Sequence, residues 1–169
     1  MLQKLCPKLQ ADSVLDLDSQ ELQKVGIRGI IFDLDNTLVE WKQENLSQET
    51  IDLISRFKDA GFKICIISNA LEYRVEAVAR LLSVPYVSRA VKPRKLPFKK
   101  ALELMGTTPE ETAVVGDQLF TDILGGNRME LYTIWTPPLS STEFFSTRAV
   151  RQLERMVIKR FRKKGILRS

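Results

Sequence analysis

The chain has 169 residues, 44% of them hydrophobic and 28% charged, which is the size and composition of one folded domain with a sizeable core. It contains no histidine and two cysteines, which excludes imidazole-dependent catalysis, four-cysteine zinc sites and a disulfide framework. The net charge of +5 is uneven, because residues 148–169 hold nine Lys or Arg against the single Glu154, net +8, and leave −3 for residues 1–147.

The chain shows no sign of crossing a membrane or of being exported. No stretch approaches the roughly 18 to 20 apolar residues that a spanning helix requires. The first residues, Met1 to Pro7, lack the apolar core and the cleavage site of a secretory signal. Cys6 and Cys65 are too few for a disulfide framework, so we expect a reducing, cytoplasmic environment.

Five apolar runs rich in β-branched residues predict strands, at residues 29–32, 62–67, 86–87, 112–115 and 131–135. Helical spacing of apolar residues predicts helices over 47–60, 71–82 and 97–105, and a terminal helix over 142–164. Gly125, Gly126 and Asn127 are expected to form a flexible turn. Since strands and helices alternate, we expect an α/β, Rossmann-like three-layer fold around a mainly parallel sheet.

Polar side chains follow the ends of these predicted strands. They are Asp33 and Asp35 after the first strand, Ser68 and Asn69 after the second, Lys92 before the third helix, and Asp117 and Asp122 after the fourth strand. Taken singly, each motif is more typical of a turn, a helix cap or a solvated loop. Because the carboxyl ends of parallel strands meet at one edge, the combination indicates a crevice for a phosphate and a divalent metal.

The residue types suit phosphate-ester hydrolysis without histidine. Asp33 can attack phosphorus directly to form an acyl-phosphate, while Asp35 can protonate the leaving alcohol and later deprotonate the attacking water. Mg²⁺ would relieve the repulsion between carboxylate and phosphate, with Asp33, Asp117 and a backbone carbonyl as oxygen ligands. Lys92 would add a second positive charge, and the pair Ser68–Asn69 would donate hydrogen bonds to phosphoryl oxygens.

The order and spacing of these motifs resemble the haloacid-dehalogenase (HAD) superfamily over about residues 24–137. The form Asp33-Leu34-Asp35-Asn36-Thr37-Leu38, with Trp41 nearby, is similar to the subclass IIIA phosphatases. The resemblance implies that Asp33 is the nucleophile and that Asp35 is the acid/base, with its main-chain carbonyl bound to Mg²⁺. It implies that Ser68 binds the phosphate and that Lys92 clamps it by charge. It also implies that Asp117 is a metal ligand and, less directly, that Asp122 is a partner of the lysine or of the metal. Lys95 is close enough in the chain to compete as the clamp, although the spacing to Phe98 favours Lys92.

Short intervals between the motifs predict an open site. Only 33 positions separate Asp35 from Ser68 and 23 separate Asn69 from Lys92, which one crossover helix and a short strand fill. No large cap domain is therefore expected. We divide the chain into a HAD-like phosphatase domain over residues 1–139 and a basic helix and tail over 140–169 packed on it. An open site suits a phosphate presented on a large partner, such as a lipid surface, a protein or a nucleic acid.

The basic tail admits more than one interpretation. In a helix over 142–164, five cations would share one face, namely Arg148, Arg151, Arg155, Lys159 and Arg162. This pattern is typical of a helix that binds an anionic membrane surface peripherally. It is equally typical of a terminal helix that packs its apolar side on the sheet and leaves its cations solvated. Slight aromatic interleaving argues against nucleic acid.

The lead-in to the nucleophile strand narrows the expected substrate by resemblance. Residues 11–31 are similar to the start of capless HAD proteins that include the phosphatidylglycerophosphate phosphatases. This implies a Mg²⁺-dependent enzyme of phospholipid biosynthesis that yields phosphatidylglycerol. Two alternatives stay open, namely a HAD phosphatase acting on a soluble phosphoester or phosphoprotein, and an RNA- or ribosome-associated binding protein on a HAD scaffold. The sequence does not indicate an oligomeric state.

Overall fold

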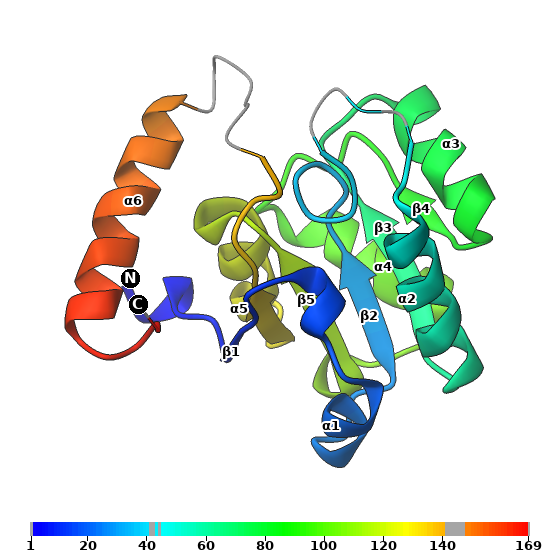
Figure 1. Cartoon of the computed structure of the whole chain (residues 1–169), viewed down its shortest axis with the longest axis horizontal. Coiled ribbons are helices and arrows are strands. Elements are labelled where there is room, and N and C mark those ends of the chain that lie inside the picture. The colour runs from blue at the N-terminus through cyan, green and yellow to red at the C-terminus, as the bar shows by residue number, and fades with distance from the viewer. Residues whose placement is uncertain (1, 41–42, 44, 141–147, 169) are drawn as a thin grey trace.

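The computed structural model describes residues 2–40, 43, 45–140 and 148–168. Its centre is a six-stranded sheet in the order β1-β6-β5-β2-β3-β4, in which every pairing is parallel. Helices lie on both faces of this sheet, so the expected α/β three-layer fold is confirmed (Figure 1). The chain builds outward from β2 in one direction and then returns to the other side of it, which makes the end of β2 a topological switch point.

All five predicted strands are present, and the structure adds one more. The strands are β1 (Leu9–Gln10), β2 (Gly29–Phe32), β3 (Lys63–Ile67), β4 (Tyr86–Val87), β5 (Thr112–Gly116) and β6 (Tyr132–Trp135). The additional strand is β1, a pair of residues at the edge of the sheet beside β6. The four central strands carry almost wholly buried residues, as expected for a sheet covered on both faces.

The helices are α1 (Ser19–Lys24), α2 (Gln48–Asp59), α3 (Glu72–Leu82), α4 (Lys95–Met105), α5 (Leu124–Arg128) and α6 (Arg148–Lys163). Short 3₁₀ turns cover Leu2–Leu5, Val14–Asp16 and Pro109–Glu111. The predicted start of α2 is confirmed, because the Ser47 hydroxyl accepts a hydrogen bond from the Thr50 amide. The predicted end of α4 is confirmed as well, since Gly106 takes the left-handed conformation with φ 65°.

One prediction in this part of the chain is wrong. Gly125 and Gly126 do not form a flexible turn but lie in α5, directly after the π-helical turn Leu119–Ile123. A Cβ on Gly125 would lie 2.5 Å from the Phe98 ring, and one on Gly126 would lie 2.4 Å from the Val114 side chain. The glycines therefore serve close packing of α5 against α4 and the sheet, rather than backbone freedom.

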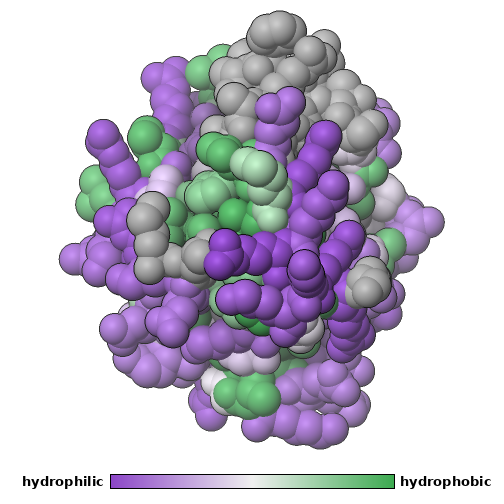
Figure 2. All heavy atoms as spheres, turned by 90° about the vertical axis from the view of Figure 1, so that its left-hand side faces the viewer, coloured by the Kyte–Doolittle hydropathy of each residue, from purple (hydrophilic) through white to green (hydrophobic). Residues whose placement is uncertain are grey.

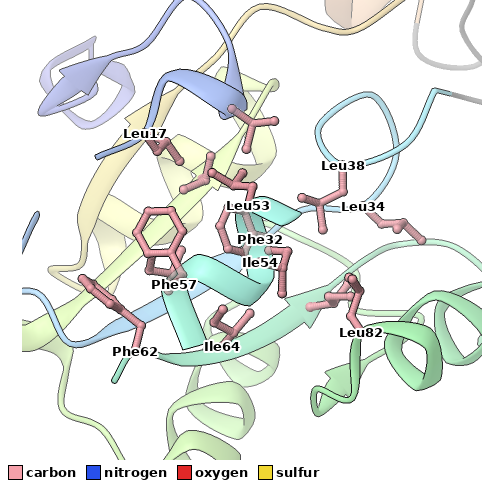
Figure 3. Close-up of a cluster of buried hydrophobic side chains, with 14 of the residues drawn as sticks. Leu17, Phe32, Leu34, Leu38, Leu53, Ile54, Phe57, Phe62, Ile64 and Leu82 are labelled. Atoms are coloured by element: carbon pink, nitrogen blue, oxygen red, sulfur yellow. The ribbon is translucent and has the colours of Figure 1, made fainter. Parts of the chain in front are cut away.

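The hydrophobic core divides according to the two faces of the sheet. On one face, α2 buries Leu53, Ile54 and Phe57 against strand residues such as Phe32 and Ile64 (Figure 3). On the other face, α4 packs against Ile31, Cys65, Ile67 and Val114 by means of Phe98, Ala101, Leu102 and Met105. Alternate residues of β2 and β3 thus serve opposite layers, which fixes the strand register and the height at which each strand ends.

The terminal helix α6 packs on the flank of the domain. Phe161 is buried beside Leu119, Ile123 and Trp135 in a third apolar cluster. Glu154, the only acid of this region, is also buried and accepts a hydrogen bond from the Phe120 amide at 3.1 Å. Residues 142–147 of the predicted helix lie outside the described part of the chain.

Figure 2 looks onto the side of the molecule that carries α6, where hydrophilic side chains surround a smaller hydrophobic area. The exposed cations of the helix include Arg155, Lys159 and Arg162, and Leu153 and Met156 are exposed beside them. Among the described helices, none is long and apolar enough to span a bilayer.

Candidate active site

The predicted site residues meet at the carboxyl edge of the sheet. Asp33 follows β2, the strand between β5 and β3, and its amide donates to the Val115 carbonyl at 2.9 Å. Ser68 continues β3 and donates its amide to the Val87 carbonyl at 3.0 Å. Asp117 directly follows β5. Between β2 and β3 the described chain holds the helix α2, and between β3 and β5 it holds α3, β4, α4 and a 3₁₀ turn, so no large cap domain lies among the described residues.

Three of the predicted residues form a buried charged cluster. The Lys92 ammonium donates to Asp33 Oδ1 at 2.5 Å and to Asp122 Oδ1 at 2.6 Å. The side chains are almost inaccessible, with 4% of Lys92, 9% of Asp33 and 1% of Asp122 exposed. Asp122 also accepts from the Gln118 amide through its second oxygen. The structure thus brings Lys92 to Asp33, whereas Lys95 is exposed at the first position of α4.

Burial and charge act in opposite directions on this cluster. Burial raises the pKa of Asp33 to about 7, although the adjacent Lys92 charge acts to lower it. Burial by itself would lower the pKa of Lys92, but the charges and hydrogen bonds of Asp122 and Asp33 outweigh it and raise that pKa above its usual value. Lys92 therefore remains a cation, and Asp33 needs positive charge nearby to ionise fully.

The donor set fits a hard divalent cation. Asp33, Asp117 and Asp122 are all buried, and one carboxylate oxygen from each lies within 4.8 Å of the others. Three carboxylates and the one Lys92 ammonium leave a net charge of −2 when all are ionised, which a divalent ion would neutralise. Oxygen-only ligands favour Mg²⁺ over softer metals. The expected ligands Asp33 and Asp117 are therefore together, with Asp122 close enough to join them.

A glycine makes room for this arrangement. A Cβ on Gly116 would come within 2.4 Å of the Asp122 side chain. No rotamer of another residue type removes that overlap, because the Cβ position is fixed by the backbone. The Gly116-Asp117 sequence thus lets Asp122 approach the end of β5 and reach Lys92.

Asp35 lies outside the buried cluster and forms a different ion pair. Its Oδ1 accepts from Arg74 Nη2 at 2.8 Å and from Arg74 Nε at 3.0 Å. The pair is partly accessible, with 24% of the Asp35 side chain and 19% of the Arg74 side chain exposed. Arg74 also donates to the Gln43 carbonyl at 2.9 Å, which ties α3 to the loop after β2. The Asp35 carboxylate is thus held by Arg74 close to Ser68 and is partly accessible to solvent.

Ser68 and Asn69 connect the motifs to one another. The Ser68 hydroxyl lies 3.5 Å from Asp35 Oδ2 and accepts from the Ala70 amide at 3.0 Å. Asn69 Oδ1 accepts from the Lys92 amide at 2.9 Å, so it positions the segment that carries the lysine. Both residues lie at the expected edge, and their contacts with a phosphate remain predictions.

Sequence reasoning missed Arg74. An arginine in the first turns of an amphipathic helix is ordinarily a solvated surface residue, so the residue type alone does not indicate a function. Its place six residues after Ser68, on the helix that begins at the carboxyl edge, is the one feature that could have drawn attention to it.

Comparison with known proteins gives consistent results. The family model of haloacid dehalogenase-like hydrolases matches residues 39–129. The protein named Probable phosphatase YqeG of Bacillus subtilis is 38% identical over 153 residues, which cover 90% of this chain and 89% of that protein. Phosphatidylglycerophosphate phosphatase 1 of Arabidopsis thaliana is 33% identical over 97% of this chain, and the match spans 50% of that longer protein.

A solved structure supports the fold. The cobalt-bound form of deoxy-D-mannose-octulosonate 8-phosphate phosphatase from Haemophilus influenzae superposes with a TM-score of 0.55 at 14% identity. The superposition covers 89% of this chain and 96% of that one. At this identity the likeness concerns the architecture, which is the same layered arrangement around a parallel sheet.

Proposed function

The chain belongs to the haloacid dehalogenase-like hydrolases, and from this premise we propose that it is a Mg²⁺-dependent phosphatase that removes the terminal phosphate of phosphatidylglycerophosphate. The observation that carries the proposal is the buried cluster at the carboxyl edge, in which Lys92 bridges Asp33 and Asp122 beside Asp117. This arrangement gives a carboxylate nucleophile a fixed position beside one ammonium group and beside further carboxylates that could hold a divalent cation.

Asp33 is the proposed nucleophile. Lys92 holds one of its oxygens, Oδ1, and leaves the other to attack phosphorus. The new bond joins that oxygen to phosphorus while the bond from phosphorus to the ester oxygen breaks, which gives an aspartyl-phosphate and an alcohol. The Lys92 ammonium also opposes the negative charge that accumulates on the phosphoryl oxygens.

Asp35 is the proposed acid and base. It delivers a proton to the departing alkoxide, and in the second step it takes a proton from the water that attacks the aspartyl-phosphate and releases phosphate. Its position at the open side of the cluster suits both tasks, because the leaving alcohol and the water must arrive from solvent. Arg74 orients the carboxylate through two nitrogen contacts to the same oxygen.

Asp33 and Asp117, with Asp122 beside them, would hold Mg²⁺. When bound, the ion neutralises the repulsion between the nucleophile and the phosphate and polarises the phosphoryl group. The metal identity rests on the oxygen-only donor set and on the charge balance of the cluster.

The lipid substrate is supported by sequence similarity and by the open site. The match to the Arabidopsis thaliana phosphatidylglycerophosphate phosphatase 1 covers 97% of this chain, so it includes the motifs and the flanking segments. The described chain between β2 and β3 and between β3 and β4 holds a single helix each, α2 and α3, so a large substrate can approach.

A phosphate-release assay tests this proposal. Phosphatidylglycerophosphate in mixed micelles, glycerol 3-phosphate, a nucleoside monophosphate and a sugar phosphate are compared at equal phosphate concentration, with Mg²⁺ and with a chelator. We expect hydrolysis of the lipid to exceed that of the soluble esters and to vanish with the chelator. Preference for a soluble ester would refute the lipid substrate and leave a phosphatase of soluble compounds.

A further inference from the structure

A second basic region lies next to the active site, apart from the basic tail. Residues 77–102 contain seven Lys or Arg and no Asp or Glu. One of the seven is the buried Lys92, and the other six are exposed. Three of these, Arg89, Arg94 and Lys95, lie on the segment between β4 and the first turn of α4. This local excess of cations is not evident from the net charge of residues 1–147, which is negative.

Large apolar side chains are exposed on this segment and on the segment that follows β3. Leu96 is 75% exposed and Val91 55% exposed on the segment after β4. On the neighbouring segment after β3, Tyr73 is 71% exposed and Leu71 52% exposed. Exposed apolar side chains of this size on two adjoining segments suit an interaction surface.

Backbone hydrogen bonds hold the two segments together. The Arg89 amide donates to the Ala70 carbonyl at 3.0 Å, and the Ala90 amide donates to the Ser68 carbonyl at 3.0 Å. The Lys92 amide completes the connection through Asn69 Oδ1. We call the resulting surface the rim and define it as Leu71, Tyr73, Arg89, Val91, Arg94, Lys95 and Leu96.

Two residues of the rim have a left-handed backbone conformation. Arg89 has φ 46° and Val91 has φ 53°, both in the left-handed region. For the β-branched Val91 this conformation is a genuine outlier, and such strain concentrates at functional segments. The next residue, Lys92, turns inward to Asp33, so the same short segment presents one side chain to the nucleophile and its neighbour to solvent.

We propose that the rim is the surface by which the protein rests on an anionic lipid bilayer, with the apolar side chains entering the interface and the cations meeting lipid phosphates. The inference rests on the proposed lipid substrate, and it names the residues that bring the active site to the membrane that contains this lipid. Exposed aliphatic residues interleaved with cations match the bilayer interface in both polarity and charge. Glu72 is the one carboxylate within the described segments 68–73 and 88–96.

The terminal helix is less suited to this task. Its Val157 and Ile158 pack against the third apolar cluster and its Phe161 is part of that cluster, so these residues are committed to the fold. The helix lies on the flank of the domain (Figure 1), whereas the rim includes Val91, the neighbour of the Lys92 that contacts Asp33. A protein resting on the rim presents Asp33 to phosphates at the membrane surface.

Vesicle sedimentation tests the rim independently of catalysis. Binding is measured to phosphatidylcholine vesicles and to phosphatidylcholine mixed with phosphatidylglycerol, neither of which contains a phosphomonoester. The variants are Tyr73→Gln with Leu96→Gln, and Arg89→Gln with Lys95→Gln. The matched controls are Leu104→Gln, an exposed leucine at the far end of α4, and Lys63→Gln at the opposite edge of the sheet.

We expect the unaltered protein to bind the mixed vesicles, each rim variant to bind them about tenfold more weakly, and both controls to bind normally. Hydrolysis of a soluble phosphoester should be the same in all of them. Rim variants that bind as well as the unaltered protein would overturn the inference. So would loss of binding in Arg155→Gln with Lys159→Gln when the rim variants retain it, or binding of the rim to a short RNA but not to vesicles.

The design separates this inference from the proposed function. Vesicle binding that depends on the rim, without hydrolysis of phosphatidylglycerophosphate, would refute the proposed substrate and support the proposed membrane-binding surface. Hydrolysis of micellar phosphatidylglycerophosphate, without any vesicle binding, would keep the substrate and refute the surface.

Discussion

Asp33 and Asp35 are two residues apart in the chain and lie in contrasting surroundings. Asp33 belongs to an almost inaccessible cluster, together with Lys92 and two further carboxylates. Asp35 forms a partly accessible pair with Arg74. The contrast teaches that one short loop can place one carboxylate where burial controls its charge and another where solvent can reach it, which are the surroundings that the proposed nucleophile and the proposed acid/base need.

Asp33→Asn should give the largest effect, because it removes the proposed nucleophile. Loss of a nucleophile costs activity on the order of 10⁴-fold to 10⁶-fold in comparable enzymes, and we expect this range for every phosphoester. The amide can still accept from Lys92, which also retains Asp122, so the melting temperature should change little. Phosphate release with Mg²⁺ and thermal unfolding check the two parts. Turnover within tenfold of the unaltered protein would remove Asp33 from this role.

Asp35→Asn should give a loss that depends on the leaving group. General acid catalysis contributes about 10²-fold to 10⁴-fold, so alkyl phosphates should lose activity in this range. Aryl phosphates, whose leaving groups need less protonation, should lose much less. Comparing glycerol 3-phosphate with p-nitrophenyl phosphate gives the measurement. Equal losses on both would contradict the acid role and erase the contrast between the two aspartates.

Lys92→Met should reduce activity by about 10²-fold to 10³-fold, since it removes a charge aimed at the phosphoryl group. It should also destabilise the metal-free protein by about 3–5 kcal/mol, because buried carboxylates lose their counter-charge. Urea unfolding at pH 8, with and without Mg²⁺, measures this, and the ion should recover part of the loss. Lys95→Met is the matched control, exposed and three residues away, with an expected change within about 0.5 kcal/mol. Equal destabilisation by both variants would contradict the buried cluster.

The smallest effect concerns pH. Burial raises the pKa of Asp33 to about 7, and a protonated carboxyl is a poor metal ligand. The apparent Mg²⁺ affinity should therefore rise with pH up to about 7 and level off above it, and it should weaken by up to about tenfold for each pH unit below. Calorimetric titration from pH 5.5 to 8.5 measures the curve. A flat curve would show that Asp33 is ionised throughout and that burial does not control its charge.

The sequence was informative where pattern and position coincide. Near-continuous apolar runs predicted the strands, and the rule that parallel strands end at one edge placed Asp33, Ser68 and Asp117 together. Those predictions depend on the local composition of the strands and on the alternation of strands and helices that indicates a parallel sheet. Both can be recognised in a single sequence.

Features set by tertiary contacts could not be predicted. The strand β1 has two residues and no alternation of its own, and it exists because β6 offers an edge. The prediction of a turn at Gly125 is wrong because a single sequence does not distinguish a glycine needed for close packing from one needed for a turn. Arg74 became recognisable as part of the site when the structure placed α3 beside the loop after β2.

The buried contact from Glu154 to the Phe120 amide has a practical consequence for anyone trimming this protein. The acceptor lies in the carboxyl-terminal helix, yet it anchors the stretch between the candidate metal ligands Asp117 and Asp122. Shortening the chain ahead of α6 would remove that anchor and uncover Leu119 and Trp135. The last helix thus supports the segment that carries the candidate site residues. Loss of activity in a variant without this helix would therefore reflect a disturbed fold and would not measure membrane attachment.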